Sequence, residues 1–185
     1  RDLREHTSIW DDWANENGEL ETAYGRYWRK YPPMATSVAN PTEASNDDTP
    51  VDQIERVVEN IKENPHSRRH VVVAWHPANA WNSKLPPCHF AFVFHVRTDG
   101  VLCMEVHQRS GDVALGVPFN MSGYALLLGM VAKEVGLRPG LMKHNITNAH
   151  IYSNHIDKLA EQMSNEPVGG RVMVETPSKS VLDMS

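Results

Sequence analysis

Apolar residues at helical spacing predict an amphipathic helix soon after residue 50. One face of that helix would gather the apolar side chains of Ile54, Val57, Val58 and Ile61. Thr49 can cap the helix and Pro50 suits its first position, while Pro65 stops it. Residues 32–50 are rich in Pro, Ser, Thr, Asn and Asp, which is typical of a loop.

The segments that follow are strand-like. Residues 70–75 form one continuous apolar run, and residues 89–96 and 101–109 flank RTDG (97–100), a natural hairpin turn. A long, mostly apolar pattern predicts a helix over 118–136. Three further elements are predicted: a short strand near 142–149, a helix over about 153–164 and a strand over 171–175.

Helices and strands are mixed without strict alternation, which predicts an α+β fold. We expect a mixed, largely antiparallel sheet with helices packed on one face. The 185 residues are enough for one domain with a substantial core, so residues 1–185 are expected to form a single domain. Hydrophobic residues make up 41% and charged residues 22%, values that indicate an ordinary globular protein.

Charge and cysteine content disfavour several classes of protein. The net charge of −5 and the pI near 6.0 indicate no general basic surface for nucleic acid, so no DNA partner is expected. Two cysteines cannot build a disulfide framework, which favours a reducing, cytoplasmic compartment. No apolar run approaches the roughly 20 residues that span a bilayer, so no membrane association is expected.

One of the two cysteines has an unusual setting. Cys88 follows two prolines and precedes His89 in the segment LPPCHF (85–90). A reactive cysteine needs a fixed backbone, a partly open site and nearby positive charge, whereas a buried one behaves as a small hydrophobe. Cys103 lies mid-strand and fits the second description. Neighbouring side chains on a strand point to opposite faces, which disfavours Cys88 and His89 as the pair of a cysteine hydrolase.

Three arginines and a serine stand where regular elements end. Arg68 and Arg69 lie between a predicted helix and a strand, and Arg109 and Ser110 lie where another strand runs into a loop. Guanidinium groups bind phosphate oxygens with paired hydrogen bonds, and a hydroxyl adds another. These residues are candidate phosphate ligands, with surface ion pairs as the alternative. An arginine near Cys88 would also stabilise its thiolate.

Asn120 and a group of histidines are the remaining candidates for chemistry. Asn120 interrupts an apolar segment, and its amide can match the edge of a uracil ring or cap a helix. His144, His150 and His155 prompt the question of a metal site. Neither a cysteine nor a carboxylate completes a ligand set with them, so no metal is predicted.

Six motifs occur in order along the chain and carry a family resemblance. They are IWDDWANENG (9–18), YGRYWR (24–29), NPHSRR (64–69), LPPCH (85–89), QRSGDVALGVPFN (108–120) and HIYSNH (150–155). Together they resemble the folate-dependent thymidylate synthase family, whose nucleophile is a cysteine, from about residue 7 to residue 162. The resemblance implies that family's fold and the reductive methylation of dUMP to dTMP. It also implies 5,10-methylenetetrahydrofolate as co-substrate.

The resemblance further implies which residues attack the base and hold the phosphate. Cys88 would add to C6 of the uracil ring. Arg109 and Ser110 would hold the phosphate in the same subunit, and Arg109 would help to ionise the thiol. Arg68 and Arg69 would reach the site of a partner subunit, so the resemblance implies a homodimer.

Other matched residues would surround the base and the sugar. Asn120 would read the pyrimidine edge, and His89 would line the pocket after the nucleophile. His150 and Tyr152 would hydrogen-bond the sugar hydroxyl.

Three more matched residues would serve the folate and the proton transfer. Asp112 would accept hydrogen bonds from the pterin, and Trp10 would pack beside the folate and shield the reactive intermediate. Tyr24 would assist removal of the C5 proton through ordered water.

The chain departs from the family pattern beside these residues. Gly111 stands where Cys or Ala is usual, and Thr147 and Asn148 stand where a Gly-Asp pair is usual. Pyrimidine-nucleotide hydroxymethylases use the same cysteine and folate and are one alternative; a nucleotide- or RNA-binding homologue without catalysis is another. Asn120 favours uracil over cytosine, and Trp10 favours methylation because it would exclude water. The family's N-terminal arginine and glutamate and its C-terminal closing segment cannot be placed, so we expect a fragment of a longer enzyme.

Overall fold

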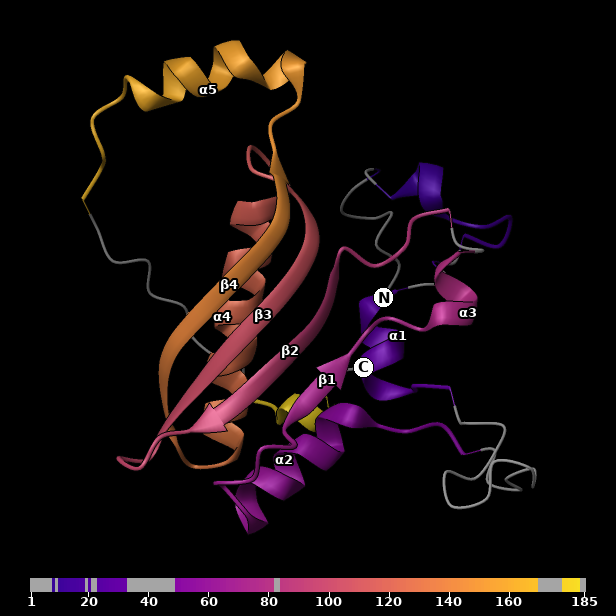
Figure 1. The fold of residues 1–185 in the computed structure, drawn as a ribbon, viewed down its shortest axis with the longest axis vertical. Helices are drawn as coiled ribbons and strands as arrows, with labels where there is room; N and C mark the ends of the chain where they lie inside the picture. Colours follow the sequence, from indigo (N-terminus) through magenta and orange to yellow (C-terminus); the bar gives the residue numbers. More distant parts are fainter. Residues whose placement is uncertain are drawn as a thin grey trace. The chain divides into compact units, whose positions relative to one another are not determined.

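The computed structural model describes residues 8, 10–18, 20, 23–32, 49–81, 84–169 and 178–183. The chain divides into two compact units, one formed by residues 1–53 and 73–87 and the other by residues 54–72 and 88–185. The second unit contains most of the regular structure (Figure 1). No helix among the described residues is long and apolar enough to cross a membrane.

A four-stranded mixed sheet is the framework of the second unit. Its strands lie in the order β1 (Val71–Val73), β2 (His89–Val96), β3 (Val101–Asp112) and β4 (Arg138–His150). β2 and β3 are antiparallel and are joined at the predicted turn, where Gly100 has a φ of 75°. β3 and β4 are parallel. The predicted α+β fold with a mixed sheet is confirmed.

The long helix α4 (Gly116–Glu134) connects β3 to β4 and packs on one face of the sheet (Figure 1). Parallel neighbours need such a crossover, because a tight turn cannot return the chain to the same end of the sheet. The buried residues of this layer include Leu102, Met104, Val106, Tyr124, Leu128 and Val131. The helix is followed by Gly136, whose φ of 71° suits a glycine at a helix end.

Shorter helical elements complete the second unit. They are α2 (Gln53–Glu63), η3 (Ser153–His155), α5 (Ile156–Met163) and η4 (Val181–Asp183). α2 buries the four apolar residues that its pattern predicted to share a face. Glu134 at the end of α4 bonds to α2 and to the residue before η4. It accepts from Lys62 Nζ at 3.1 Å and from Ser180 Oγ at 2.6 Å.

Among its described residues, the first unit contains three short helical elements, η2 (Asp11–Trp13), α1 (Tyr24–Arg29) and α3 (Pro77–Ala80). The side chain of Gln53 connects separate segments of this unit. Its Nε2 donates to the Tyr27 carbonyl at 2.7 Å and to the Val73 carbonyl at 2.8 Å, and its Oε1 accepts from the Val73 N–H at 2.9 Å. Arg29 pairs with Asp52 at 2.6 Å.

Three predicted strands have different limits in the structure. β3 continues beyond the predicted 101–109 to Asp112. The apolar run over 70–75 forms only the three residues of β1. The strand expected near 142–149 begins at Arg138, although Pro139 and Gly140 are residue types that normally mark turns. Gly140 is required at its position, because a Cβ there would collide with Val101 of β3. Close pairing with β3 therefore extends β4 through a segment whose local sequence does not favour a strand.

The remaining predictions have mixed outcomes. The helix expected over 153–164 is present as η3 followed by α5. Cys103 is buried in β3, as its sequence setting predicted. The predicted strand over 171–175 and most of the predicted loop over 32–50 lie outside the described residues. The single domain over 1–185 stays a prediction.

Candidate active site

Cys88 and Arg109 meet at the end of the β2–β3 pair that lies opposite the hairpin turn. Cys88 directly precedes β2, and Arg109 lies near the end of β3. The Arg109 N–H donates to the Cys88 carbonyl at 2.8 Å, and its Nη2 donates to the Cys88 sulfur at 3.9 Å. Cys88 forms no disulfide bond and is half-buried. A partly open thiol beside a guanidinium is the setting that favours a reactive cysteine.

An irregularity in β2 directs His89 toward α4. Relative to β3, β2 carries one extra residue between His89 and Ala91. An extra residue of this kind changes the alternation of side chains along a strand. His89 and Phe92 both contact Tyr124 of α4, with ring centroids at 5.3 and 5.4 Å. The bulge thus places the imidazole on the same side as the hydrophobic core.

Burial keeps His89 uncharged at neutral pH. Its Nδ1 lies 2.6 Å from the hydroxyl of Tyr124. Burial and, secondly, the nearby His144 lower the pKa of His89 to about 4. A neutral imidazole has one donor and one acceptor nitrogen. His89 can therefore exchange hydrogen bonds beside Cys88, while Arg109 supplies the positive charge.

Asn120 belongs to a hydrogen-bonded group with Gln108 and His144. Nε2 of Gln108 donates to the Ser110 carbonyl at 2.8 Å and to Asn120 Oδ1 at 3.2 Å. Nε2 of His144 lies 2.7 Å from Gln108 Oε1. The cap position of α4 is occupied by Leu115, so the interpretation of Asn120 as a helix cap is wrong.

A second group of candidate residues meets where the parallel strands β3 and β4 end. Asp112 and His150 are paired in register, and the Val113 N–H donates to the His150 carbonyl at 2.9 Å. The rings of His150 and Tyr152 meet edge to face, with centroids 5.1 Å apart. Nδ1 of His155 lies 3.9 Å from Asp112 Oδ1. Parallel pairing thus brings the QRSGD and HIYSNH motifs together.

The packing around Gly111 explains one departure from the family pattern. Ser110 lies opposite Asn148 in the β3–β4 register, and Gly111 follows it. A Cβ at Gly111 would lie 3.0 Å from the Cγ2 atoms of both Ile146 and Val117. These two branched side chains fill the space that a side chain at position 111 would need.

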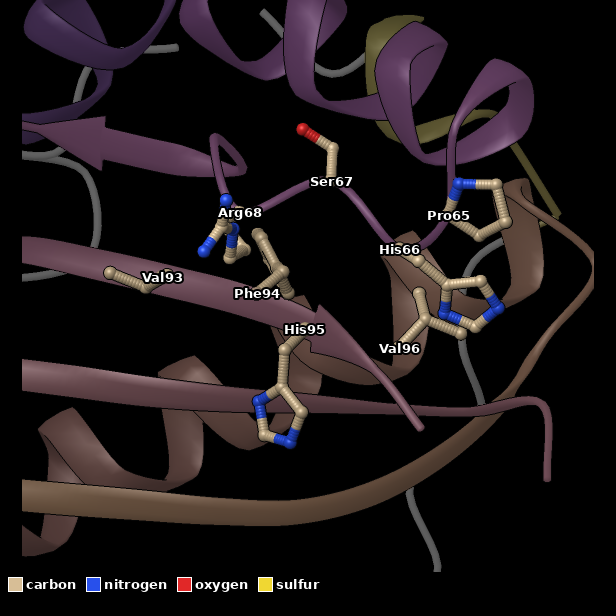
Figure 2. Close-up of a pocket in the computed structure, with 8 residues that line it drawn as sticks. All are labelled: Pro65, His66, Ser67, Arg68, Val93, Phe94, His95 and Val96. Atoms are coloured by element: carbon tan, nitrogen blue, oxygen red, sulfur yellow. The ribbon is translucent and has the colours of Figure 1, made fainter. Parts of the chain in front are cut away.

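Arg68 and Arg69 lie between α2 and β1 and are exposed. Arg68 lines a hollow of about 370 Å³ with residues 65–67 and 93–96, and Figure 2 shows its side chain pointing toward β2. This part of β2 begins five residues beyond Cys88, a separation of about 16 Å along an extended strand. Within one chain, the structure therefore does not bring Arg68 to the nucleophile.

Trp10 and Tyr24 belong to the first unit. Trp10 precedes η2 and is 38% exposed. Tyr24 is the first residue of α1, and its ring centroid lies 6.2 Å from that of Trp28. The folate and proton-transfer roles of Trp10 and Tyr24 stay predictions.

Gln108 and Tyr124 have no predicted role, and His144 is a candidate only for a metal site in the sequence-based predictions. The alternation of buried and more exposed positions along β3 could have identified Gln108. Gln108 continues the buried series of Met104 and Val106 and is itself 3% exposed, so its amide must find partners inside the protein. In the part of the chain that the structure describes, no three His, Cys, Asp or Glu side chains form a group that could hold a metal ion.

Comparisons with known proteins identify the family of the chain. The family model of thymidylate synthase matches residues 1–184. A curated thymidylate synthase from Haloferax volcanii is 46% identical over 180 residues, which cover 89% of this chain and 52% of that protein. The chain belongs to the thymidylate synthase family, and it spans about half the length of this curated relative.

Proposed function

We propose that this member of the thymidylate synthase family methylates dUMP at C5 to form dTMP, with 5,10-methylenetetrahydrofolate as co-substrate. The observation that carries the proposal is the contact between Cys88 and Arg109, which lie within the region matched by the family. Its curated relative from Haloferax volcanii bears the name thymidylate synthase.

Cys88 is the nucleophile of the proposed reaction. Arg109 donates a hydrogen bond to the sulfur and can pair with the thiolate that attacks the base. The thiolate bonds to C6 of the uracil ring, and the C5–C6 π electrons move toward C5 and the O4 carbonyl. C5 can then bond to the one-carbon unit and lose its proton, and the bond between that carbon and the folate nitrogen breaks. Hydride addition to the same carbon expels the thiolate and restores the C5–C6 double bond, so covalent catalysis divides one difficult substitution into easier steps.

Recognition of the base is assigned to Asn120. Its Oδ1 accepts from Gln108, and its Nδ2 has no hydrogen-bond partner among the described residues. Nδ2 can therefore donate to O4 of uracil, while the second lone pair of Oδ1 accepts from N3–H. His89 lines the pocket as a neutral ring and bonds to the base or to ordered water without adding charge.

The phosphate is assigned to arginines of two subunits. Arg109 and Ser110 would hold it in the subunit that carries the nucleophile, through a guanidinium and a hydroxyl. Arg68 and Arg69 are exposed, and Arg68 lies beside a part of β2 that is far from Cys88, which supports their use by a second copy of the chain. A homodimer with shared sites follows from this assignment.

The end of the β3–β4 pair is assigned to the sugar and the folate. His150 and Tyr152 lie together there and can hydrogen-bond the sugar hydroxyl. The carboxylate of Asp112 fits a pterin ring. Its Oδ1 accepts from the Ala114 N–H at 3.0 Å, and its Oδ2 has no hydrogen-bond partner among the described residues. The folate supplies the one-carbon unit and the hydride that reduces it. Trp10 would exclude water beside it, and Tyr24 would pass the C5 proton to ordered water.

The product mass formed by the full-length protein tests the proposal. The protein is supplied with dUMP and methylenetetrahydrofolate, and the nucleotide product is weighed. A methyl group at C5, with dihydrofolate formed alongside, is the expected result. A hydroxymethyl group with tetrahydrofolate would reassign the protein as a dUMP hydroxymethylase. A failure to consume dUMP, with no covalent adduct to 5-fluoro-dUMP and the folate, would indicate a binding protein without catalysis.

A further inference from the structure

We propose that His144 and Gln108 are positioning residues that orient the Asn120 amide and thereby set the preference for uracil over cytosine. The inference rests on the proposed function, because it concerns how that site selects its base. The inference is based on three hydrogen bonds of Gln108, to the Ser110 carbonyl, to Asn120 and to His144.

The orientation of the group is decided by a backbone carbonyl. The Ser110 carbonyl can only accept hydrogen bonds, so the Gln108 group that faces it at 2.8 Å must be the amino group Nε2. This identifies the two ends of the Gln108 amide, whose oxygen and nitrogen are similar in shape. Gln108 is 3% exposed, so bulk water offers no alternative partners. Its orientation is therefore set from within the protein.

Both neighbours of Gln108 are oriented in turn. Its Nε2 needs an acceptor from Asn120, so the atom at 3.2 Å is Oδ1. Its Oε1 needs a donor, so Nε2 of His144 at 2.7 Å carries a hydrogen. Burial lowers the pKa of His144, which favours the neutral ring. Nδ1 of His144 is buried without a hydrogen-bond partner among the described residues, so a hydrogen on that nitrogen would be left unpaired.

The Asn120 amide consequently presents a defined pattern to a base. Its Nδ2 is a donor and its Oδ1 keeps one lone pair, which matches the O4 acceptor and the N3–H donor of uracil. Cytosine has an amino donor and an unprotonated N3 in these places, which is the opposite pattern. An Asn120 amide rotated to suit cytosine would point Nδ2 at Nε2 of Gln108, and two donors would face each other. His144 opposes this rotation by holding the oxygen end of Gln108.

The test is the ratio of the dissociation constants for dCMP and dUMP, measured by calorimetry on the full-length protein without folate. His144→Phe removes the donor but keeps a ring beside Tyr124, whose centroid lies 6.5 Å from the imidazole. We expect the preference for dUMP to fall by roughly 5-fold to 100-fold, which is the discrimination of one paired base contact. Gln108→Leu should lower the ratio at least as far, and the double variant should match Gln108→Leu, because both changes act on one amide.

Two variants serve as controls. His144→Gln retains an N–H donor and should keep the ratio within about twofold of the wild-type value. His107→Phe makes the same type of change next to Gln108 on β3, at a half-exposed ring that contacts Phe90, and should leave the ratio unchanged.

The outcomes separate this inference from the proposed function. If the wild-type protein does not bind dUMP, both fail. If the wild-type protein prefers dUMP while His144→Phe and Gln108→Leu weaken both nucleotides equally, only the positioning role is overturned, because a purely structural defect lowers affinity without changing the ratio. If one of these variants does not fold, the ratio of the dissociation constants for dCMP and dUMP is measured on the other. A lowered ratio then supports the positioning role, and an unchanged ratio overturns it. Should both fail to fold, a lowered ratio in His144→Gln would overturn the inference and a preserved ratio would support it.

Discussion

The stability of the protein should fall as the pH is lowered through the range in which His89 titrates in the unfolded chain. In the folded protein, burial and the nearby His144 lower the pKa of His89 from 6.5 to about 4. Between these values the unfolded chain binds a proton that the folded chain does not bind, so stability rises with pH across this window. The stabilisation of the folded state by neutral His89 is complete above about pH 6.5 and is lost as the pH falls toward about 4.

The size of the effect follows from the two pKa values. The two pKa values differ by about 2.5, so the unfolding free energy falls by about 3 kcal/mol once the pH is below both of them. About 2 kcal/mol of this is lost between about pH 7.5 and about pH 5. Burial also lowers the pKa values of His144 and His70, which act in the same direction. The part of the pH dependence that comes from His89 must therefore be isolated by comparison with a variant that has no titratable group at position 89.

The assay is urea unfolding of the full-length wild-type protein and of His89→Gln at several pH values. Glutamine retains polar atoms near the Tyr124 hydroxyl but carries no titratable group. From about pH 7.5 to about pH 5, the wild-type protein should lose about 2 kcal/mol more unfolding free energy than the variant. His95→Gln is the control, since His95 is exposed on the same strand. A difference in unfolding free energy between wild type and His89→Gln that stays constant over this range would show that His89 does not cause the pH dependence.

Three other outcomes are expected. Cys88→Ser should abolish the covalent adduct with 5-fluoro-dUMP and the folate, seen by mass spectrometry, while calorimetry still detects dUMP binding; persistence of the adduct would exclude Cys88 as the nucleophile. Mixing full-length Cys88→Ser with an inactive Arg68→Ala/Arg69→Ala variant should restore dTMP formation, because a mixed dimer contains one complete site; no recovery after subunit exchange would contradict the shared site. Gly140→Ala should lower the free energy of unfolding by about 1–3 kcal/mol in denaturant titrations, because the added methyl group collides with Val101 and Cys103. A change below about 0.5 kcal/mol would show that β4 accommodates the methyl group by a small shift.

Local patterns were sufficient to predict the elements whose residues are held by near neighbours in the sequence. The strand over 89–96 was predicted with the limits it has in the structure, because its apolar run ends at a recognisable turn. The buried face of α2 also follows from spacing alone. In contrast, Pro139 and Gly140 lie near the start of β4, and only the pairing of β4 with β3 makes that segment a strand.

At the candidate site, the motifs predicted the residue types, but only long-range pairing creates the contacts between them. The motifs around Cys88, Arg109 and Asn120 indicated a nucleophile, a cation and a base-reading amide, because each residue type has its own chemistry. The motifs did not show that Arg109 reaches the Cys88 sulfur, since the two residues are 21 positions apart in the chain. Antiparallel pairing creates that contact.

Six motifs in the sequence indicate the family by their resemblance, while local spacing predicts the order of most elements and the residue types indicate the chemistry at the site. The bulge that turns His89 toward Tyr124 and the contact that orients Gln108 through His144 arise only in the folded chain. Hydrogen bonds and burial depend on distances between segments that are far apart in the sequence. A buried amide or imidazole takes its orientation and its protonation from those neighbours.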